Sequence, residues 1–215
     1  CGHTYAATEL IEPYSALSGG ALELRKTAQV FVPLSAHQAW LENYVRNVAV
    51  MPEATKGYLD SWLEDGLRDW DISRNEPYWG FEIPGHPGKY FYVWFDAPIG
   101  YIGATEKVCA ETGRDFDSYW KSTADQTEIV HVIGKDIVRF HCLFWPAVLN
   151  AVGYTVPSRV QVHGWLQVNG EKMSKSKGTF ILARTYLDHL SPDYLRYYLA
   201  AKLGNGQEDF DLNFE

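Results

Sequence analysis

Residues 172–179 concentrate groups that bind phosphate. Three lysine ammonium groups fall within six positions of the run Lys172-Met173-Ser174-Lys175-Ser176-Lys177, with small hydroxyl residues between them and the turn Asn169-Gly170 directly before. A flexible loop of this composition can close on a polyphosphate, because the long lysine side chain carries a point charge that can follow a moving negative charge. The alternative is a solvated basic surface loop, which is what most Lys/Ser-rich octamers are.

Aromatic side chains gather in the run Trp94-Phe95-Asp96-Ala97-Pro98-Ile99-Gly100-Tyr101. The run crosses the point where we expect a strand to end, which is the edge at which an open α/β sheet binds its ligands. Ordinary core packing is an equal alternative for Trp94 and for Ile137. By itself, His141 is more often a hydrogen-bonded core histidine than a ligand contact.

The tripeptide Gly134-Lys135-Asp136 lies between an expected strand and an expected helix. Glycine there lets a nucleotide approach the backbone, and a carboxylate can accept hydrogen bonds from ribose hydroxyls. A helix cap is the default interpretation of an isolated tripeptide of this kind.

The apolar pattern predicts the frame that positions these residues. The continuous apolar run Tyr90–Phe95 predicts a strand inside a sheet that is covered on both faces. Further strands are predicted over Ile129–Ile133 and Val160–His163, with a helix over Ile137–Leu149 between them. Strand, helix and strand at this spacing form a βαβ unit, so the predicted fold class is α/β with a doubly wound parallel sheet.

The flanking segments predict smaller elements. Thr8–Ile11 and Ala28–Val32 are typical of short strands in a small β-rich lobe. One amphipathic helix is predicted with Ser35 as its N-cap, and another opens at Pro52-Glu53. A last helix begins at Ser191-Pro192-Asp193, where a capping hydroxyl, a proline and an acid match a helix start.

The composition bounds the class of protein. The 215 residues are enough for one core and a smaller lobe, and 46% hydrophobic with 21% charged residues is typical of globular proteins. The net charge of -8 argues against a free-standing nucleic-acid binder, so any RNA contact must be local. Three cysteines without a C-x-x-C pair indicate a reducing compartment. Since neither a leader nor a bilayer-crossing run is found, we expect a cytoplasmic protein with no membrane partner.

The five residues from Lys172 to Ser176 match the signature loop of the class I aminoacyl-tRNA synthetases. The runs Trp70–Arg74, Trp94–Tyr101 and Phe140–Pro146 resemble the methionyl-tRNA synthetases, and the resemblance extends from Cys1 to the end of the chain. It implies an enzyme that joins L-methionine to the α-phosphate of ATP, releases pyrophosphate, and transfers the methionyl group to tRNA(Met). It also implies Mg²⁺ with the ATP, and the second half of a Rossmann-type catalytic domain as the fold.

Carried over position by position, the resemblance assigns three groups of residues. Catalysis would fall to Lys172 and Lys175, which would stabilise the charge that builds on the departing pyrophosphate. The methionine pocket would be formed by Trp94, Ala97, Pro98, Tyr101, Ile137 and His141; aromatic walls hold a thioether by contacts worth about 0.3–1.5 kcal/mol each. ATP would be bound by Gly134, Asp136, His163, Gly164, Leu166, Lys172, Ser174 and Lys175, with Arg74 ordering the site.

The chain also departs from the family pattern. The family's other ATP signature, His-x-Gly-His, has no match in the sequence. Cys1 resembles the last cysteine of a zinc knuckle, but one thiolate cannot complete a tetrahedral site, so zinc is expected only in the complete protein. Residues 1–72 would end a connective insertion, residues 73–165 would form the second Rossmann half, and residues 166–215 would hold the lysine loop and the start of a helical stem-contact region. We therefore expect an internal fragment that needs the N-terminal catalytic half as its partner and is inactive or nearly so alone.

Two other functions remain open from the sequence. The chain could serve as a non-catalytic binding or assembly module, because half of the catalytic residues lie elsewhere. It could also belong to a class I synthetase for leucine, isoleucine or valine, which would share the lysine loop but lack the Trp94–Tyr101 run.

Overall fold

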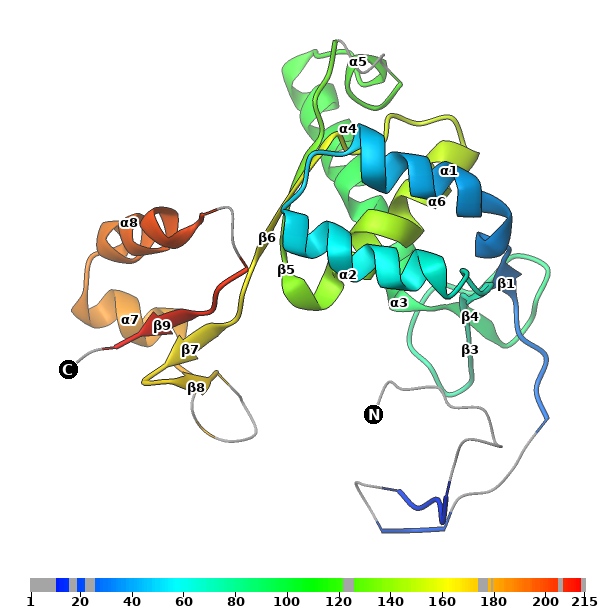
Figure 1. Cartoon of the computed structure of the whole chain (residues 1–215), viewed down its shortest axis with the longest axis horizontal. Coiled ribbons are helices and arrows are strands. Elements are labelled where there is room, and N and C mark those ends of the chain that lie inside the picture. Colours follow the sequence, from blue (N-terminus) through cyan, green and yellow to red (C-terminus); the bar gives the residue numbers. More distant parts are fainter. Residues whose placement is uncertain are drawn as a thin grey trace.

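The structure, a computed structural model, describes residues 11–15, 19–21, 26–121, 126–173, 178, 180–204 and 207–213. Figure 1 shows a larger body that holds α1 to α6, and a smaller lobe in which β7, β8 and β9 lie beside α7 and α8. The long strand β6 leads from the body into the lobe (Figure 1). None of the helices in the described part of the chain is long and apolar enough to cross a membrane.

The α-helices, in chain order, are α1 (Gln38–Asn43), α2 (Glu53–Glu64), α3 (Val93–Asp96), α4 (Ile99–Thr112), α5 (Asp117–Trp120), α6 (Trp145–Ala151), α7 (Ala183–His189) and α8 (Pro192–Lys202). The 3₁₀ turns are η2 (Leu34–His37) and η4 (Lys135–Ile137), and the π-helical segments are η3 (Tyr44–Val48) and η5 (Phe140–Phe144). The strands are β1 (Phe31–Val32), β2 (Trp70–Asp71), β3 (Ser73–Asn75), β4 (Lys89–Phe91), β5 (Val130–Gly134), β6 (Arg159–His163), β7 (Leu166–Val168), β8 (Glu171–Lys172) and β9 (Phe210–Leu212).

The predicted βαβ unit is confirmed. Strands β5 and β6 pair in parallel, from Val130 beside Arg159 to Gly134 beside His163, and a helical segment from η4 through η5 to α6 connects them. The inward side chains of β6 are buried, whereas Val132 on β5 is 60% exposed. The α/β class is therefore correct. Among the described residues, the predicted doubly wound sheet is represented at this position by the two strands β5 and β6.

The prediction of a single strand over Tyr90–Phe95 is wrong. Strand β4 ends at Phe91 and pairs antiparallel with β3, and helix α3 begins at Val93. From this helical turn, Phe95 packs against Trp70 with 5.7 Å between the ring centroids. A short apolar run does not distinguish a buried strand from a buried helical turn, and here the aromatic packing selects the turn.

The predicted helices form, with one wrong start. Ser35 does not cap a helix, because η2 already begins at Leu34 and the Ser35 hydroxyl donates to Asp69 Oδ1 at 2.5 Å. Helix α2 follows Pro52 as predicted. Helix α8 begins as predicted, and the Ser191 hydroxyl accepts a hydrogen bond from the backbone N–H of Asp193 at 3.3 Å.

The β-rich lobe is only partly tested. Residues 8–10 of the first predicted strand lie outside the described residues, and Ile11 is in a bend. Of the second predicted strand, Phe31–Val32 forms β1 and pairs antiparallel with β2.

One hydrophobic core joins the N-terminal helices to the βαβ unit. Leu41, Leu59, Leu143 and Val162 are completely or almost completely buried in it. The backbone of Val50 continues this connection, donating to the Ser158 carbonyl and accepting from the Val160 N–H, each at 2.8 Å. The core therefore fixes η4 and η5, which carry several of the predicted site residues.

Candidate active site

Three of the predicted nucleotide residues meet at the carboxyl end of the parallel strands. Gly134 ends β5 and His163 ends β6, and the two are register partners. A Cβ atom placed on Gly134 would lie 2.7 Å from Asp136 Oδ1 and 3.6 Å from His163 Cε1, so a larger residue would displace the Asp136 side chain and would touch His163 at ordinary contact distance. This cluster of Gly134, Asp136 and His163, here called the nucleotide edge, lies where parallel α/β sheets bind their ligands.

Three of the predicted pocket residues are joined by hydrogen bonds. His141 Nδ1 lies 3.1 Å from the carbonyl oxygen of Ile137, and His141 Nε2 lies 3.0 Å from the Tyr101 hydroxyl. A carbonyl only accepts, so Nδ1 carries the proton in the neutral ring and Nε2 accepts from Tyr101. Burial lowers the pKa of His141 and favours this neutral form.

Trp94 faces the same segment from helix α3. Its ring stacks on that of Phe140, with 4.7 Å between centroids and an interplanar angle of 13°. Phe140 and His141 both lie in the π-helix η5, a wide turn that is frequent at functional sites. Between Trp94 and Tyr101, Pro98 is buried and Ala97 is exposed where α3 passes into α4.

His131 belongs to this aromatic cluster, although sequence reasoning did not select it. Its ring centroid lies 5.5 Å from that of Tyr101 and 5.3 Å from that of His141. The side chain is 8% exposed, and Nε2 has no hydrogen-bond partner among the described residues. Burial, together with the nearby His141, lowers the pKa of His131 to about 4. Its inward position on β5 was the only signal that could have identified it.

The nucleotide edge and the aromatic cluster are consecutive along one segment. Gly134 begins it, the turn η4 ends at Ile137, and His141 bonds back to Ile137 one turn later. A ligand with a nucleotide at one end and an apolar side chain at the other could therefore contact both clusters.

Of the lysine loop, which we define as Lys172 to Ser176, the structure describes Lys172 and Met173. Lys172 ends β8, and its ammonium group lies 3.3 Å from the centroid of the Trp165 ring. Ser174 and Lys175 lie outside the described residues. Leu166 begins β7, which pairs antiparallel with β8 and parallel with β9, so the loop extends from a three-stranded sheet.

Gly164 has a close backbone neighbour that its predicted role did not include. A Cβ atom on Gly164 would lie 2.3 Å from the carbonyl oxygen of Glu208. The adjacent His163 ring stacks on Phe210 with 5.9 Å between centroids. The segment entering β9 therefore packs directly on two residues that were predicted to border ATP.

Arg74 lies in β3 and contacts its own hairpin. Its guanidinium lies 3.7 Å above the Tyr92 ring, donates to the Ser73 carbonyl at 2.6 Å, and lies 3.7 Å from Asp71 Oδ2. Tyr92 precedes α3, so Arg74 supports the element that carries Trp94. Its role in ordering the site stays a prediction.

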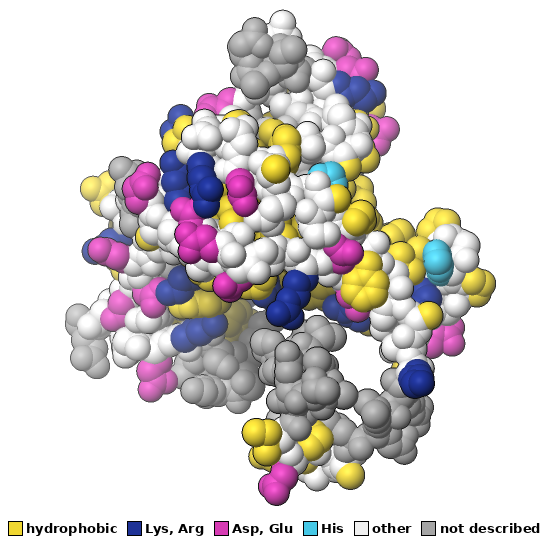
Figure 2. Space-filling model, turned by 45° about the vertical axis from the view of Figure 1, so that its right-hand side comes forward, with side chains coloured by type: hydrophobic (Ala, Val, Ile, Leu, Met, Phe, Trp, Pro, Cys, Tyr) yellow, Lys and Arg dark blue, Asp and Glu magenta, His cyan; other side chains and the backbone are white. Residues whose placement is uncertain are grey.

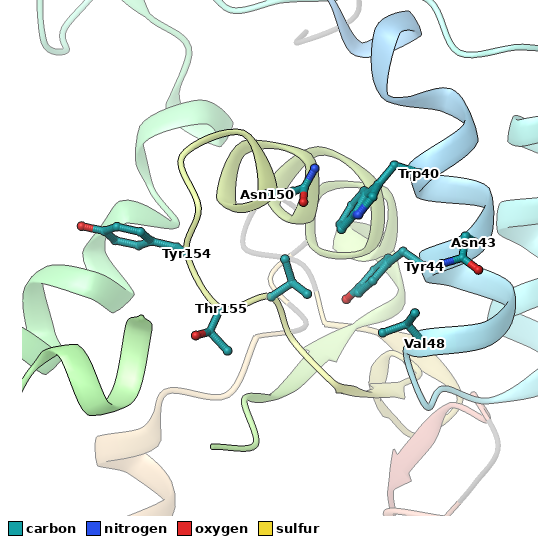
Figure 3. Close-up of a pocket in the computed structure, with 8 residues that line it drawn as sticks. Trp40, Asn43, Tyr44, Val48, Asn150, Tyr154 and Thr155 are labelled. Atoms are coloured by element: carbon teal, nitrogen blue, oxygen red, sulfur yellow. The ribbon is translucent and has the colours of Figure 1, made fainter. Parts of the chain in front are cut away.

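A hollow of about 310 Å³ lies on another part of the body (Figure 3). Figure 3 shows Trp40, Tyr44 and Val48 on one side of it, with Asn150 and Thr155 across from them. The rings of Trp40 and Tyr44 are stacked 5.2 Å apart, and the Tyr44 hydroxyl donates to the Pro157 carbonyl at 2.7 Å. These contacts belong to the packing of α1 and η3 against the segment after α6, and the predicted site residues are not among those lining the hollow.

The surface charge is mixed on the face shown in Figure 2. Acidic and basic side chains are interspersed there, with apolar side chains between them (Figure 2). On this face the net charge of -8 is therefore not gathered into one acidic field.

Comparison with known proteins links the chain to one family. A family model described as "tRNA synthetases class I (M)" matches residues 1–215. Methionine--tRNA ligase 1 of Sorangium cellulosum (strain So ce56) is 56% identical over 216 aligned positions, which cover 100% of this chain and 31% of that protein. The chain thus spans about a third of the length of this curated relative.

Solved structures of Mycobacterium tuberculosis methionyl-tRNA synthetase are also similar. The complex with methionyl-adenylate matches with a TM-score of 0.73 at 29% identity, covering 98% of this chain and 41% of that protein. The apo form matches with a TM-score of 0.65 at 27% identity, covering 93% and 37%.

Proposed function

Because the chain belongs to the methionyl-tRNA synthetases of class I, we propose that it carries the methionine pocket and the lysine loop of a methionine–tRNA ligase. In the complete protein, L-methionine and ATP would form methionyl-adenylate and pyrophosphate, and the methionyl group would pass to tRNA(Met). The observation that carries the proposal is the continuity of the nucleotide edge and the aromatic cluster, since an adenylate joins a nucleotide to an amino acid.

The aromatic cluster suits a thioether side chain. Trp94 and Tyr101 offer polarizable ring surfaces, and sulfur contacts with such rings are favourable. The two histidines near Tyr101 are held neutral by burial, so they would place no charge against an apolar ligand. Ala97, Pro98, Ile137 and His141 would complete the pocket.

The nucleotide edge suits ATP. Gly134 leaves room for a close approach, and the Asp136 carboxylate can accept hydrogen bonds from ribose hydroxyls. His163, Gly164 and Leu166 would border the adenine. Mg²⁺ would accompany ATP as part of the substrate, with Lys172, Ser174 and Lys175 near the phosphates.

Catalysis would consist of positioning and charge stabilisation. The methionine carboxylate attacks the α-phosphorus, the bond to the β-phosphate oxygen breaks, and pyrophosphate leaves with the additional negative charge. Lys172 and Lys175 would stabilise that charge as it develops, which lowers the barrier only if the contact is stronger in the transition state than before it.

The rest of the site would come from the N-terminal half of the catalytic domain. The exposed fractions of Val130 (45%) and Val132 (60%) support this proposal, since apolar side chains on a parallel strand are normally covered. Residues 73–165 would then be the second Rossmann half, between the end of a connective insertion (residues 1–72) and the stem-contact region (residues 166–215). Zinc is assigned only to the complete protein, and a cytoplasmic location stays a prediction.

The test is amino-acid-dependent exchange of pyrophosphate into ATP. The complete protein should support exchange with methionine and much less with leucine, isoleucine or valine; a preference for one of those three would replace methionine as the substrate. The 215-residue chain alone should show negligible exchange, and adding the N-terminal half in trans should restore it. Failure of the complete protein with every amino acid would favour the non-catalytic binding module.

A further inference from the structure

Asp209 connects the nucleotide edge to the sheet that bears the lysine loop. It immediately precedes β9, and its Oδ1 accepts from Lys135 Nζ at 2.6 Å and from the Trp165 backbone N–H at 2.7 Å. Its Oδ2 accepts from Gln167 Nε2 at 3.0 Å. Lys135 follows β5, whereas Trp165 directly precedes β7 and Gln167 lies within it. One carboxylate therefore holds two elements together.

The backbone around Asp209 is fixed by contacts of its own. The Phe210 N–H donates to the Trp165 carbonyl at 2.8 Å, and Glu208 lies against Gly164 so closely that a Cβ there would collide with it. β9 then continues in parallel register with β7, with Phe210 beside Leu166. Asp209 is thus held in place by the paired strand that directly follows it.

The charges nearby give this carboxylate a role. Two ammonium groups lie near the Trp165 ring, with Lys172 Nζ 3.3 Å and Lys135 Nζ 5.6 Å from its centroid. The hydrogen bond from Lys135, followed by that from the Trp165 N–H, lowers the pKa of Asp209. The carboxylate is therefore ionised at neutral pH and offsets the charge of Lys135, which stands between Gly134 and Asp136.

We infer that Asp209 is a positioning residue for ATP: it holds Lys135, and with it the turn from Gly134 to Asp136, against the strand that leads to the lysine loop. The inference rests on the proposed function, because the nucleotide edge must bind ATP for the position of the turn to matter. Asp209 itself would not touch the substrate.

An ion pair that only stabilised the fold would have little effect on ATP binding. The Lys135 and Asp209 side chains are each 30% exposed, and exposed pairs usually have little effect when they are broken. Arg159 and Glu128 provide a control pair. They lie 3.0 Å apart beside the opposite ends of β5 and β6, and their side chains are each 53% exposed. Loss of the Arg159–Glu128 pair should not displace the nucleotide edge.

The experiment is steady-state pyrophosphate exchange by the complete protein, with ATP and methionine varied in turn. Asp209→Ala should raise the KM for ATP about tenfold, because displacement of a binding turn by a fraction of an ångström is costly, and should leave the KM for methionine within about twofold. Asp209→Asn, which keeps the shape and can still accept a hydrogen bond, should have a smaller effect in the same direction. Glu128→Gln should match wild type in both constants.

A double-mutant cycle with Lys135→Met identifies the partner. If Asp209 acts through Lys135, Asp209→Ala should add less than about twofold to the ATP KM of Lys135→Met. An unchanged or lowered ATP KM in Asp209→Ala, equal rises in both KM values, or full additivity with Lys135→Met would overturn the inference while leaving the proposed function intact. An inactive wild-type protein would instead overturn the proposed function, and this inference with it.

Discussion

The hydrogen bond between Tyr101 and His141 determines what the aromatic cluster, our proposed methionine pocket, can offer a ligand. His141 donates to the Ile137 carbonyl and accepts from Tyr101, so both ring nitrogens are occupied within the protein. The Tyr101 hydroxyl has used its donor and keeps acceptor capacity. As the proposed pocket, the cluster would present mainly ring surface and no histidine charge, which fits an unbranched apolar side chain better than a polar one.

Trp94→Ala in the complete protein should mainly weaken the use of methionine. The substitution removes one ring of the Trp94–Phe140 stack, and Trp94 is half-buried. By analogy with the truncation of buried aromatics, we expect a loss of about 2–4 kcal/mol in methionine kcat/KM. The ATP KM should change little. Pyrophosphate exchange measures both constants, and Trp79→Ala is the matched control because Trp79 is 97% exposed. Equal methionine kcat/KM values in the two variants would contradict the assignment of Trp94 to the pocket.

His131 should make the stability of the chain depend on pH. Its folded-state pKa of about 4 lies below the usual 6.5, so the unfolded chain binds the proton more readily between these values. The neutral His131 therefore contributes fully to the free energy of unfolding above about pH 6.5, and this contribution decreases as the pH falls toward 4. At pH 5 it should be smaller than at pH 7 by about 2 kcal/mol. His131→Phe keeps a ring but cannot titrate. In urea unfolding, the free energy of unfolding should decrease less between pH 7 and pH 5 in this variant than in the wild type. Equal decreases in the two proteins would contradict the role of His131.

Sequence patterns identified most residues of the two clusters, but they did not identify His131 and Asp209, which contact those residues or their neighbours. Helical spacing placed Ile137 and His141 on one segment, and the βαβ pattern brought Gly134 beside His163. His131 was missed because its one signal, an inward position on the predicted strand, does not reveal that Tyr101 and His141 lie beside it. Asp209 was missed because its partners are 42 to 74 residues away in sequence, and such pairings depend on tertiary packing.

At the scale of elements, the segment from Tyr90 to Asp96 shows where patterns do not suffice. Its apolar run is compatible with a strand or a helical turn. Only the packing of the Phe95 ring, which is tilted against Trp70 and stacked on Phe91, distinguishes them. The change from β4 to α3 matters for the proposed pocket, because it stacks Trp94 on Phe140.

Gly164→Ala should disrupt the contact between β7 and β9. The added methyl group would lie 2.3 Å from the Glu208 carbonyl oxygen, so the segment before β9 must move. We expect a lower melting temperature and at least a tenfold loss in kcat/KM for ATP, since misplaced binding groups are costly by roughly this amount. Gly57→Ala in α2 is the control, because its methyl group would meet nothing within 4 Å and alanine favours a helix by about 0.5–1 kcal/mol. Equal stability of the two variants would show that the Glu208 contact gives way without cost.

At the scale of the whole molecule, the body and the C-terminal lobe carry different parts of the proposed site. The body holds the aromatic cluster and the nucleotide edge, and the lobe holds the sheet from which the lysine loop extends (Figure 1). Asp209, which accepts a hydrogen bond from Lys135, and Phe210, which packs on His163, connect the two. Methionine binding and phosphate chemistry should therefore be separable by mutation, although they serve one reaction.

Single-turnover formation of methionyl-adenylate by the complete protein tests this separation most directly. Lys175→Ala should lower the rate at saturating substrates by about 100- to 1000-fold, as for loss of one preorganised donor, with methionine affinity nearly unchanged. Trp94→Ala should instead shift the methionine concentration at which the rate saturates. A near-normal rate with Lys175→Ala, together with unchanged methionine dependence in Trp94→Ala, would contradict the assignment of both the loop and the pocket.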